Sequence, residues 1–429
     1  MFDYERLEQI KDPIIREAVE AAIRQNLMTA CTNYAYPGQF SVTADGRHFG
    51  EANTWPGLDS WQMAGAYLLL GMPEVVLGYF DFVEHSQRAD GNIPFAIYPA
   101  EDYADPKSRE TCAKLRYPED IFSYIPPDPD YPTRQWIGQF RHWVIENPLS
   151  LLGPICYPLT AREIFDSLKD KAWLKEKLPS SERACRYIIT KKDDRGLIGG
   201  AGFYIELPPR QEWDGITQCY CYKAFGDMAD LYTAVEEPSL AAFWRAEANG
   251  VRKAFLKYFW RGEKFAEYIH PTGGPVDWHG MSDVDFAAIG FGLATPEQVS
   301  ILWPKLQQET AFWWGDMPTQ AVTRPYTYRD WELGAPVNFF YNGPIYDMAA
   351  IGRVWYVETQ AIRAMKDWDR LRQSARLVAQ AGLKEGGYWY ERYHMLQDRR
   401  VSAAGPKGYC EYPAILVRTV LGNWEAFTQ

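Results

Sequence analysis

Apolar residues recur at helical spacing along most of the chain, in segments separated by loops rich in glycine, proline and aromatic residues. Several segments carry proline or a capping residue in the expected first turn, as at Pro73, Pro238 and Thr295. The pattern predicts helices near residues 13–31, 58–71, 73–89, 148–167, 170–190, 217–235, 238–260, 283–292, 295–308, 341–356, 358–382 and 411–422.

Strand signals are few and short. The clearest are residues 200–207 and 265–269. Strands and helices do not alternate regularly, and no glycine-rich phosphate or dinucleotide loop occurs. A parallel α/β sheet is therefore disfavoured.

Long irregular segments alternate with pairs of predicted helices. This is the pattern expected if helical hairpins close into a toroid whose loops surround one central depression. The absence of a repeat of fixed period disfavours a solenoid. We therefore expect one all-α domain over residues 1–429, an (α/α)6 toroid of helical hairpins with long aromatic loops and a few short β-hairpins.

Composition limits the classes of partner. Hydrophobic residues make up 47% of the 429 residues and charged residues 24%, as is usual for a globular protein with a large core. The net charge of −11, without a dense basic run, disfavours nucleic acid or an anionic membrane as partner. The start of the chain does not resemble a secretory signal, no apolar run approaches roughly 20 residues, and the seven cysteines are scattered. These features predict a cytoplasmic protein and leave its oligomeric state open.

The segment 211–215 places Asp214 directly after Trp213. A carboxylic acid held against a large apolar ring is desolvated, so it keeps its proton to higher pH and can serve as a general acid. The alternative is that Trp213 belongs to the core and Asp214 caps the helix that follows. The local sequence leaves both interpretations open.

A second isolated carboxylate, Glu391, lies within the aromatic segment 388–393, two residues after Trp389. Two carboxylates framed by aromatic rings are typical of glycoside hydrolysis, in which one protonates the leaving oxygen and the other acts at the anomeric carbon.

Other aromatic loops suggest a wall for a sugar. Asp59 could accept hydroxyl hydrogen bonds while Trp55 or Trp61 stacks on the apolar face of the ring. Asp59 is equally a good helix N-cap, and that alternative stays open. A further aromatic loop, 338–348, contains Tyr341.

A metal or cofactor site is not indicated. His279, Asp283 and Asp285 lie close together in sequence, but one histidine with two capping-type aspartates is more typical of a helix start than of a metal site. We expect no cofactor.

Taken in order, these motifs resemble the six-hairpin glycosidases, most closely glycoside hydrolase family 63, over roughly residues 45–425. The segment 59–61 after Trp55 is similar to an Asp-Ser-Trp segment of that family. Trp213 and Asp214 match the start of its Trp-Asp-Asn-Ser-like general-acid motif, and 340–346 corresponds to a Tyr-Trp-Arg-Gly-Pro-Ile-Trp motif. The segment 390–393 is similar to the Tyr-Glu-x-Tyr context of the general base.

The resemblance implies an inverting glycosidase with Asp214 as acid and Glu391 as base, and with Trp55, Asp59, Trp61, Trp213, Tyr341 and Trp389 around the sugar. Members of such families sometimes carry a structural calcium ion, for which this sequence specifies no ligands. Three departures, at Gly215 and Ile216, at Asn342 and at Tyr346, prevent transfer of a sugar specificity. Glu411 is a rival for the base.

Alternatives remain on the same fold. Family 78 rhamnosidases are similar enough to stay open. A sugar epimerase or isomerase would use histidines as acid and base, which the scarcity of histidine disfavours. A noncatalytic carbohydrate-binding protein would keep the aromatic wall without needing Asp214 and Glu391.

Overall fold

The computed structural model describes residues 2–32, 39–47, 53–99, 121–125, 139–145, 149–200, 210, 212–308, 329–332, 349–395 and 401–429. Over these residues the chain is mostly helical with three small sheets, as the hydrophobic pattern predicted. No helix in this described part is long and apolar enough to cross a bilayer.

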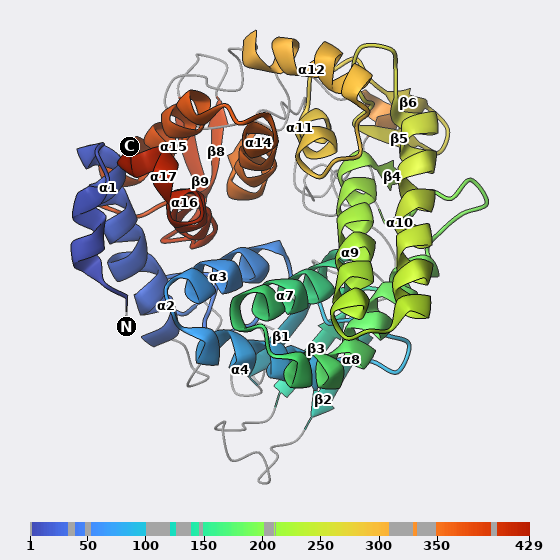
Figure 1. Ribbon diagram of the computed structural model, residues 1–429, viewed down its shortest axis with the longest axis horizontal. Helices are drawn as coiled ribbons and strands as arrows, with labels where there is room; N and C mark the ends of the chain where they lie inside the picture. The colour runs from blue at the N-terminus through green and yellow to red at the C-terminus, as the bar shows by residue number, and fades with distance from the viewer. Residues whose placement is uncertain are drawn as a thin grey trace.

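The helices follow one another around a ring (Figure 1). Six inner helices of the described chain contact each other in a closed circuit, each touching the next and the last touching the first. They are α3 (Leu58–Leu69), α7 (Leu152–Leu168), α9 (Gly215–Ala234), α11 (Asp283–Gly290), α14 (Gly352–Met365) and α16 (Glu411–Leu421).

Outer helices cover this circuit, each packed against the inner helix that it follows in the chain. They are α4 (Pro73–Glu84), α8 (Lys171–Ile189), α10 (Pro238–Phe259), α12 (Pro296–Gln308) and α15 (Trp368–Lys384). The N-terminal elements α1 (Pro13–Ala21) and η2 (Ala22–Leu27) pack on α16, and α1 also contacts α15. Short segments η1 (Tyr4–Gln9), α2 (Met28–Thr32), η4 (Asp330–Glu332) and α17 (Trp424–Thr428) complete the helices. The two ends of the chain therefore meet and close the ring (Figure 1).

The three sheets are antiparallel and lie in the long connections that lead into inner helices. The first has the order β1-β3-β2, the second β4-β5-β6 and the third β7-β8-β9. Their strands are β1 (Ala96–Pro99), β2 (Ile121–Ile125), β3 (Gln139–Trp143), β4 (Trp213–Asp214), β5 (Tyr268–His270), β6 (Gly274–Val276), β7 (Ala349–Ile351), β8 (Tyr390–Met395) and β9 (Val401–Lys407). The strand predicted at 265–269 forms only from Tyr268 onward, and 201–207 lies outside the described residues.

Connection lengths fix the direction of the helices. Each of the five hairpins from α3–α4 to α14–α15 joins its two helices through at most five residues, so the two must run antiparallel. The long connections all return to the start of the next inner helix. The inner helices therefore all begin at one end of the ring, which we call the long-connection end, and finish at the opposite, short-connection end.

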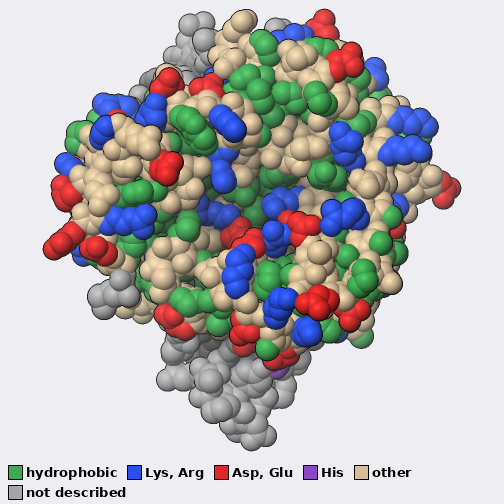
Figure 2. Space-filling view, viewed as in Figure 1, with side chains coloured by type: hydrophobic (Ala, Val, Ile, Leu, Met, Phe, Trp, Pro, Cys, Tyr) green, Lys and Arg blue, Asp and Glu red, His purple; other side chains and the backbone are tan. Residues whose placement is uncertain are grey.

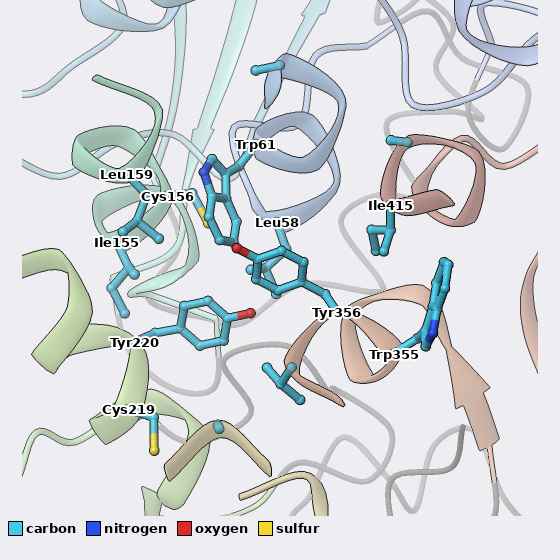
Figure 3. Packing of buried hydrophobic residues seen from close by; sticks show 14 of the residues in the cluster. Leu58, Trp61, Ile155, Cys156, Leu159, Cys219, Tyr220, Trp355, Tyr356 and Ile415 are labelled. Carbon is cyan, nitrogen blue, oxygen red and sulfur yellow. The ribbon is translucent and has the colours of Figure 1, made fainter. Parts of the chain in front are cut away.

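Aromatic side chains fill the middle of the ring. Trp61 of α3, Tyr220 of α9 and Tyr356 of α14 converge there (Figure 3). The Trp61 ring meets Tyr220 and Tyr356 edge-on, with centroid distances of 5.9 and 5.1 Å. We call these three residues the aromatic plug. The centre of the face in Figure 2 is hollowed, and basic and acidic side chains gather around the hollow.

The packing of α15 gives a test of the fold. Gly382 lies in this helix, and a Cβ atom there would stand 2.1 Å from the ring of the fully buried Trp389. Gly382→Ala is therefore expected to lower the free energy of unfolding by about 1–3 kcal/mol, the usual cost of overpacking a core. Urea unfolding followed by circular dichroism measures the loss.

Gly250→Ala is the matched control, because Gly250 lies inside α10 with no atom within 4 Å of an added Cβ. This change should stabilise the protein by about 0.5–1 kcal/mol through helix propensity alone. Equal effects of the two substitutions would contradict the packing of Trp389 on α15.

Candidate active site

Charged side chains of both signs collect at the long-connection end, on the first turns of inner helices. Asp59 is the second residue of α3, Asp214 caps α9, Asp283 begins α11 and Glu411 begins α16. A helix N-terminus carries a partial positive charge that favours carboxylates. Arg353, the second residue of α14, brings a cation to the same end.

Asp214 both caps α9 and keeps one oxygen unbonded. Its Oδ2 accepts hydrogen bonds from the backbone N–H of Thr217 at 3.1 Å and from the Thr217 hydroxyl at 3.0 Å. Its Oδ1 has no hydrogen-bond partner among the described residues, and it lies 3.6 Å from Nη1 of Arg210. The residue is 1% exposed. Helix capping therefore occupies only one oxygen of the carboxyl group, so the two interpretations that the sequence left open do not exclude each other.

Burial raises the pKa of Asp214, Arg210 lowers it, Asp283 raises it and the Thr217 hydrogen bonds lower it, with a result of about 6. A carboxyl group with this pKa remains partly protonated near neutral pH, as a general acid requires.

The expected source of this burial was wrong. Neighbouring residues on a strand project to opposite sides, so Trp213 and Asp214 of β4 do not share a face. The Trp213 ring instead packs beneath the guanidinium of Arg195, 4.0 Å from the ring centroid. Trp213 is therefore not the ring that desolvates the acid.

Arg210 connects Asp214 to two more acids that the sequence did not single out as partners. It binds Asp283 through two hydrogen bonds, of 3.0 and 2.9 Å, and lies 3.7 Å from Oε2 of Glu267. Arg210, Asp214, Glu267 and Asp283 are hereafter the Asp214 group. Asp285 forms the capping box with Ser282, as expected of a helix start.

His279 extends this group. Its Nδ1 lies 3.0 Å from Glu267 and its Nε2 lies 3.2 Å from Glu332, while the Tyr268 hydroxyl donates to Glu332 at 3.2 Å. Burial opposes protonation of His279, but the two carboxylates outweigh it and raise the pKa of the ring. The buried imidazolium therefore bridges Glu267 and Glu332 and compensates their negative charge. It has no exposed surface that a substrate could contact.

Replacing His279 should change stability by an amount that depends on pH. A histidine whose pKa is raised on folding stabilises the protein fully below its unfolded pKa of about 6.5, and the contribution is lost as pH rises through the folded pKa. His279→Gln is therefore expected to cost more free energy of unfolding at pH 6 than at pH 9, measured by urea titration. The control His85→Gln changes an exposed side chain and should stay within about 0.5 kcal/mol at both pH values. An equal loss for His279→Gln at both values would contradict the charged link.

A second cluster surrounds Arg353. Its Nη2 lies 2.9 Å from Oδ1 of Asp59, and its Nε lies 3.0 and 3.3 Å from the two carboxylate oxygens of Glu411. Gly57, not Asp59, is the N-cap of α3, so the capping interpretation of Asp59 was wrong. Burial raises the pKa of Glu411, Arg353 lowers it and Asp59 and Glu391 raise it, with a result of about 8.

Glu391 belongs to this cluster and lies on β8. It is 6% exposed and accepts hydrogen bonds of 3.1 and 2.8 Å from Arg392. Gly405 of β9 passes so close that an added Cβ would stand 2.4 Å from Oε2 of Glu391, and its φ of +80° also favours glycine. Asp59, Arg353, Glu391 and Glu411 are hereafter the Arg353 group.

The prediction that Trp61 and Trp389 line a sugar site is wrong. Trp61 and Trp389 are fully buried, Trp61 in the aromatic plug and Trp389 with its Nε1 bonded to the carbonyl of Val378 at 2.9 Å. Neither offers a face to a ligand. Trp55 is half-buried, with its Nε1 donating to Asn53. Tyr341 lies outside the described residues.

A metal centre finds no support in the part of the chain that the structure describes. No group of three or more histidine, cysteine or acidic side chains there is arranged to hold a metal ion. The carboxylates of both groups are held by arginines.

No protein-family model matches the chain, and no curated protein matches its sequence. Solved structures do match. A family 78 rhamnosidase of Bacillus sp. GL1 has a TM-score of 0.62 at 15% identity, covering 97% of this chain and 35% of that one. A rhamnosidase from Klebsiella oxytoca with rhamnose bound has a TM-score of 0.62 at 12% identity, covering 97% and 64%.

A third match spans both chains almost completely. The family 63 mannosylglycerate hydrolase from Thermus thermophilus, in complex with glucose, has a TM-score of 0.58 at 15% identity over 94% of this chain and 99% of that one. This chain thus covers about a third of the first rhamnosidase but nearly all of the hydrolase. At these identities the likeness establishes the fold, and the expected resemblance to six-hairpin glycosidases is confirmed at that level.

Proposed function

We propose that the ring of hairpins is an (α/α)6 toroid forming a single catalytic domain, and that the protein is an inverting glycoside hydrolase. The observation that carries the proposal is Asp214, a buried carboxyl group with one oxygen fixed by Thr217, the other unbonded among the described residues, and a pKa near 6. It lies at the ring end that also holds the Arg353 group.

In the proposed reaction Asp214 donates its proton from Oδ1 to the glycosidic oxygen as the bond to the anomeric carbon breaks. Glu391 takes a proton from a water molecule, whose oxygen attacks that carbon from the opposite face. Arg353 holds Glu411 and Asp59 in place beside Glu391. An inverting arrangement places the acid and the base about 6.5–9.5 Å apart, with room for the water.

The substrate is proposed to be a small α-glycoside or an oligosaccharide. Two kinds of glycosidase share the fold, a rhamnosidase and a mannosylglycerate hydrolase, so an α-L-rhamnosidase activity is the second candidate. The family 63 type is placed first because the order of the sequence motifs resembles that family most closely.

The testing experiment is a hydrolysis screen over α-glucosides, α-mannosides, α-rhamnosides and glycosyl-glycerates, with proton NMR of the first product anomer. Hydrolysis with inversion is expected. Retention of configuration would exclude this mechanism, and cleavage of rhamnosides alone would select the second candidate.

A further inference from the structure

A separate cavity lies toward the short-connection end of the ring, away from the acidic groups. Its volume is about 580 Å³, within the range of sites for small molecules. It is lined by residues from the middle and last turns of inner helices, among them Gly65, Glu163, Lys223, Tyr356, Arg363 and Arg418. The proposed glycosidase reaction uses none of these residues.

The aromatic plug separates this cavity from the candidate active site. Trp61 and Tyr220 are fully buried, and with Tyr356 they converge in the middle of the ring (Figure 3). The Tyr220 hydroxyl lies close enough to Glu411 at one end and Arg418 at the other for both charges to act on its pKa, which burial raises. The cavity is thus a distinct space and not an extension of the sugar site.

Tyr356 brings an unused hydrogen-bond donor to the cavity. The residue is 5% exposed, and its hydroxyl forms no hydrogen bond within the described residues. Burial raises its pKa, so the hydroxyl keeps its proton and remains a donor. Because Tyr356 lines the cavity, a ligand atom or a water molecule bound there could accept this hydrogen bond.

Three cations lie around this hydroxyl. Each of them lines the cavity, and the charge of each lowers the pKa of Tyr356, against the larger effect of burial. They are Arg418, Lys223 and Arg363. Arg418 pairs with Glu163 at 2.5 Å and Lys223 with Asp227 at 2.8 Å.

Arg363 is different, because no carboxylate of the described chain pairs with it. It bonds only the neutral Gln360, at 3.3 Å. The other acid of the lining, Asp166, faces Arg162 and Lys169 at 2.6 and 2.9 Å. The cavity therefore has a positive excess in a protein of net charge −11.

We propose that this cavity binds a small oxyanion, a carboxylate or phosphate group that accepts hydrogen bonds from the Tyr356 hydroxyl and the Arg363 guanidinium. Both donors suit such a group, since guanidinium matches planar oxyanions and a protonated phenol adds a neutral donor. Lys223 and Arg418 add favourable positive charge while they stay paired with Asp227 and Glu163. The proposal is independent of the glycosidase function.

The test is isothermal titration of the full chain with inorganic phosphate and, separately, with malonate in low-salt buffer. Saturable binding of at least one probe is expected. Tyr356→Phe removes only the unpartnered hydroxyl, so the fold should be kept while affinity falls roughly ten- to a hundredfold. Arg363→Met should weaken binding at least as much.

Tyr157→Phe is the matched control. Its hydroxyl is buried but bonded to Ser180 at 3.0 Å and does not line the cavity, so affinity should be unchanged. Two outcomes overturn the proposal. Without saturable binding by the unaltered chain, the basic side chains would only compensate the C-terminal ends of the inner helices. Binding that survives both Tyr356→Phe and Arg363→Met would place the anion elsewhere.

Discussion

Replacing Asp214 with asparagine is expected to lower kcat on an unactivated glycoside by about 10²- to 10⁴-fold, the usual contribution of a general acid. The fold should survive, because the asparagine oxygen can still accept the two hydrogen bonds from Thr217 and asparagine caps helices as well as aspartate does. What is lost is the proton on Oδ1. Sugar binding should therefore remain while turnover falls.

The leaving group makes this test specific. A dinitrophenyl glycoside departs without protonation, so Asp214→Asn should lose far less activity on it than on an alkyl glycoside. Asp170→Asn is the control, because Asp170 also caps a helix, α8, through bonds of 2.8 and 3.1 Å, but lies on the surface. It should leave both rates unchanged. Equal losses on the two substrates would remove Asp214 from the role of acid.

The same reasoning gives the pH profile. Only the protonated carboxyl donates, so the rate should fall about tenfold per pH unit above the pKa of Asp214, near 6. This alkaline limb should disappear in Asp214→Asn. Measurement of kcat/KM from pH 5 to 9 on the alkyl glycoside provides the comparison. A limb that persists in the variant would assign it to another group.

Helix positions were predictable from the sequence because long apolar periodicities determine them. The errors concern the predicted helices 341–356 and 358–382. Residues 341–348 lie outside the described part of the chain, 349–351 form β7 instead of a helix, and the break expected near residue 357 is absent. The chain instead turns at Lys366, which adopts φ of +57° at the end of α14. Glycine usually occupies such a position, so no local signal announced the turn. The inner helix continues through residue 357 because its residues from 352 to 359 are all buried in the ring.

The acidic residues of the site could also be located from the sequence, but their partners could not. Arg353 pairs with Asp59 and Arg210 with Asp283 across 294 and 73 positions of the chain. Such pairs form only once the ring closes. Arg353 gave no signal in the sequence, because in the helix predicted over 341–356 it stands in the last turn, where the dipole favours a cation. In the structure it is the second residue of α14.

For the tryptophans, the sequence predicted a role at the site that the structure does not support. Trp61 and Trp389 have the same kind of aromatic and acidic neighbours in sequence as a sugar-binding tryptophan, yet both are fully buried. Gly65, near Trp61 on α3, leaves room for the side chains of Glu163 and Arg418, which an added Cβ would meet at 2.3 and 2.2 Å. Whether a ring faces a ligand or the core depends on how neighbouring helices pack around it, which is a tertiary property.

The second large effect concerns the base. Glu391→Gln is expected to lower kcat by about 10²- to 10⁴-fold, because the water would lose its proton acceptor. Glu411→Gln should cost less than about tenfold, since glutamine can still accept a hydrogen bond from Arg353. Glu391 is chosen over Glu411 as the base because of the protonation state of Glu411. A base must be deprotonated at the working pH, and burial holds the pKa of Glu411 near 8.

Azide rescue separates the two carboxylates, because a small anion can occupy the space of a deleted side chain and attack the anomeric carbon in place of water. Glu391→Ala should regain activity with azide and release a glycosyl azide of inverted configuration. Glu411→Ala should not, since this side chain is fully buried and bonded to Arg353. Rescue of Glu411→Ala alone would transfer the base to Glu411 and leave Glu391 with a supporting charge.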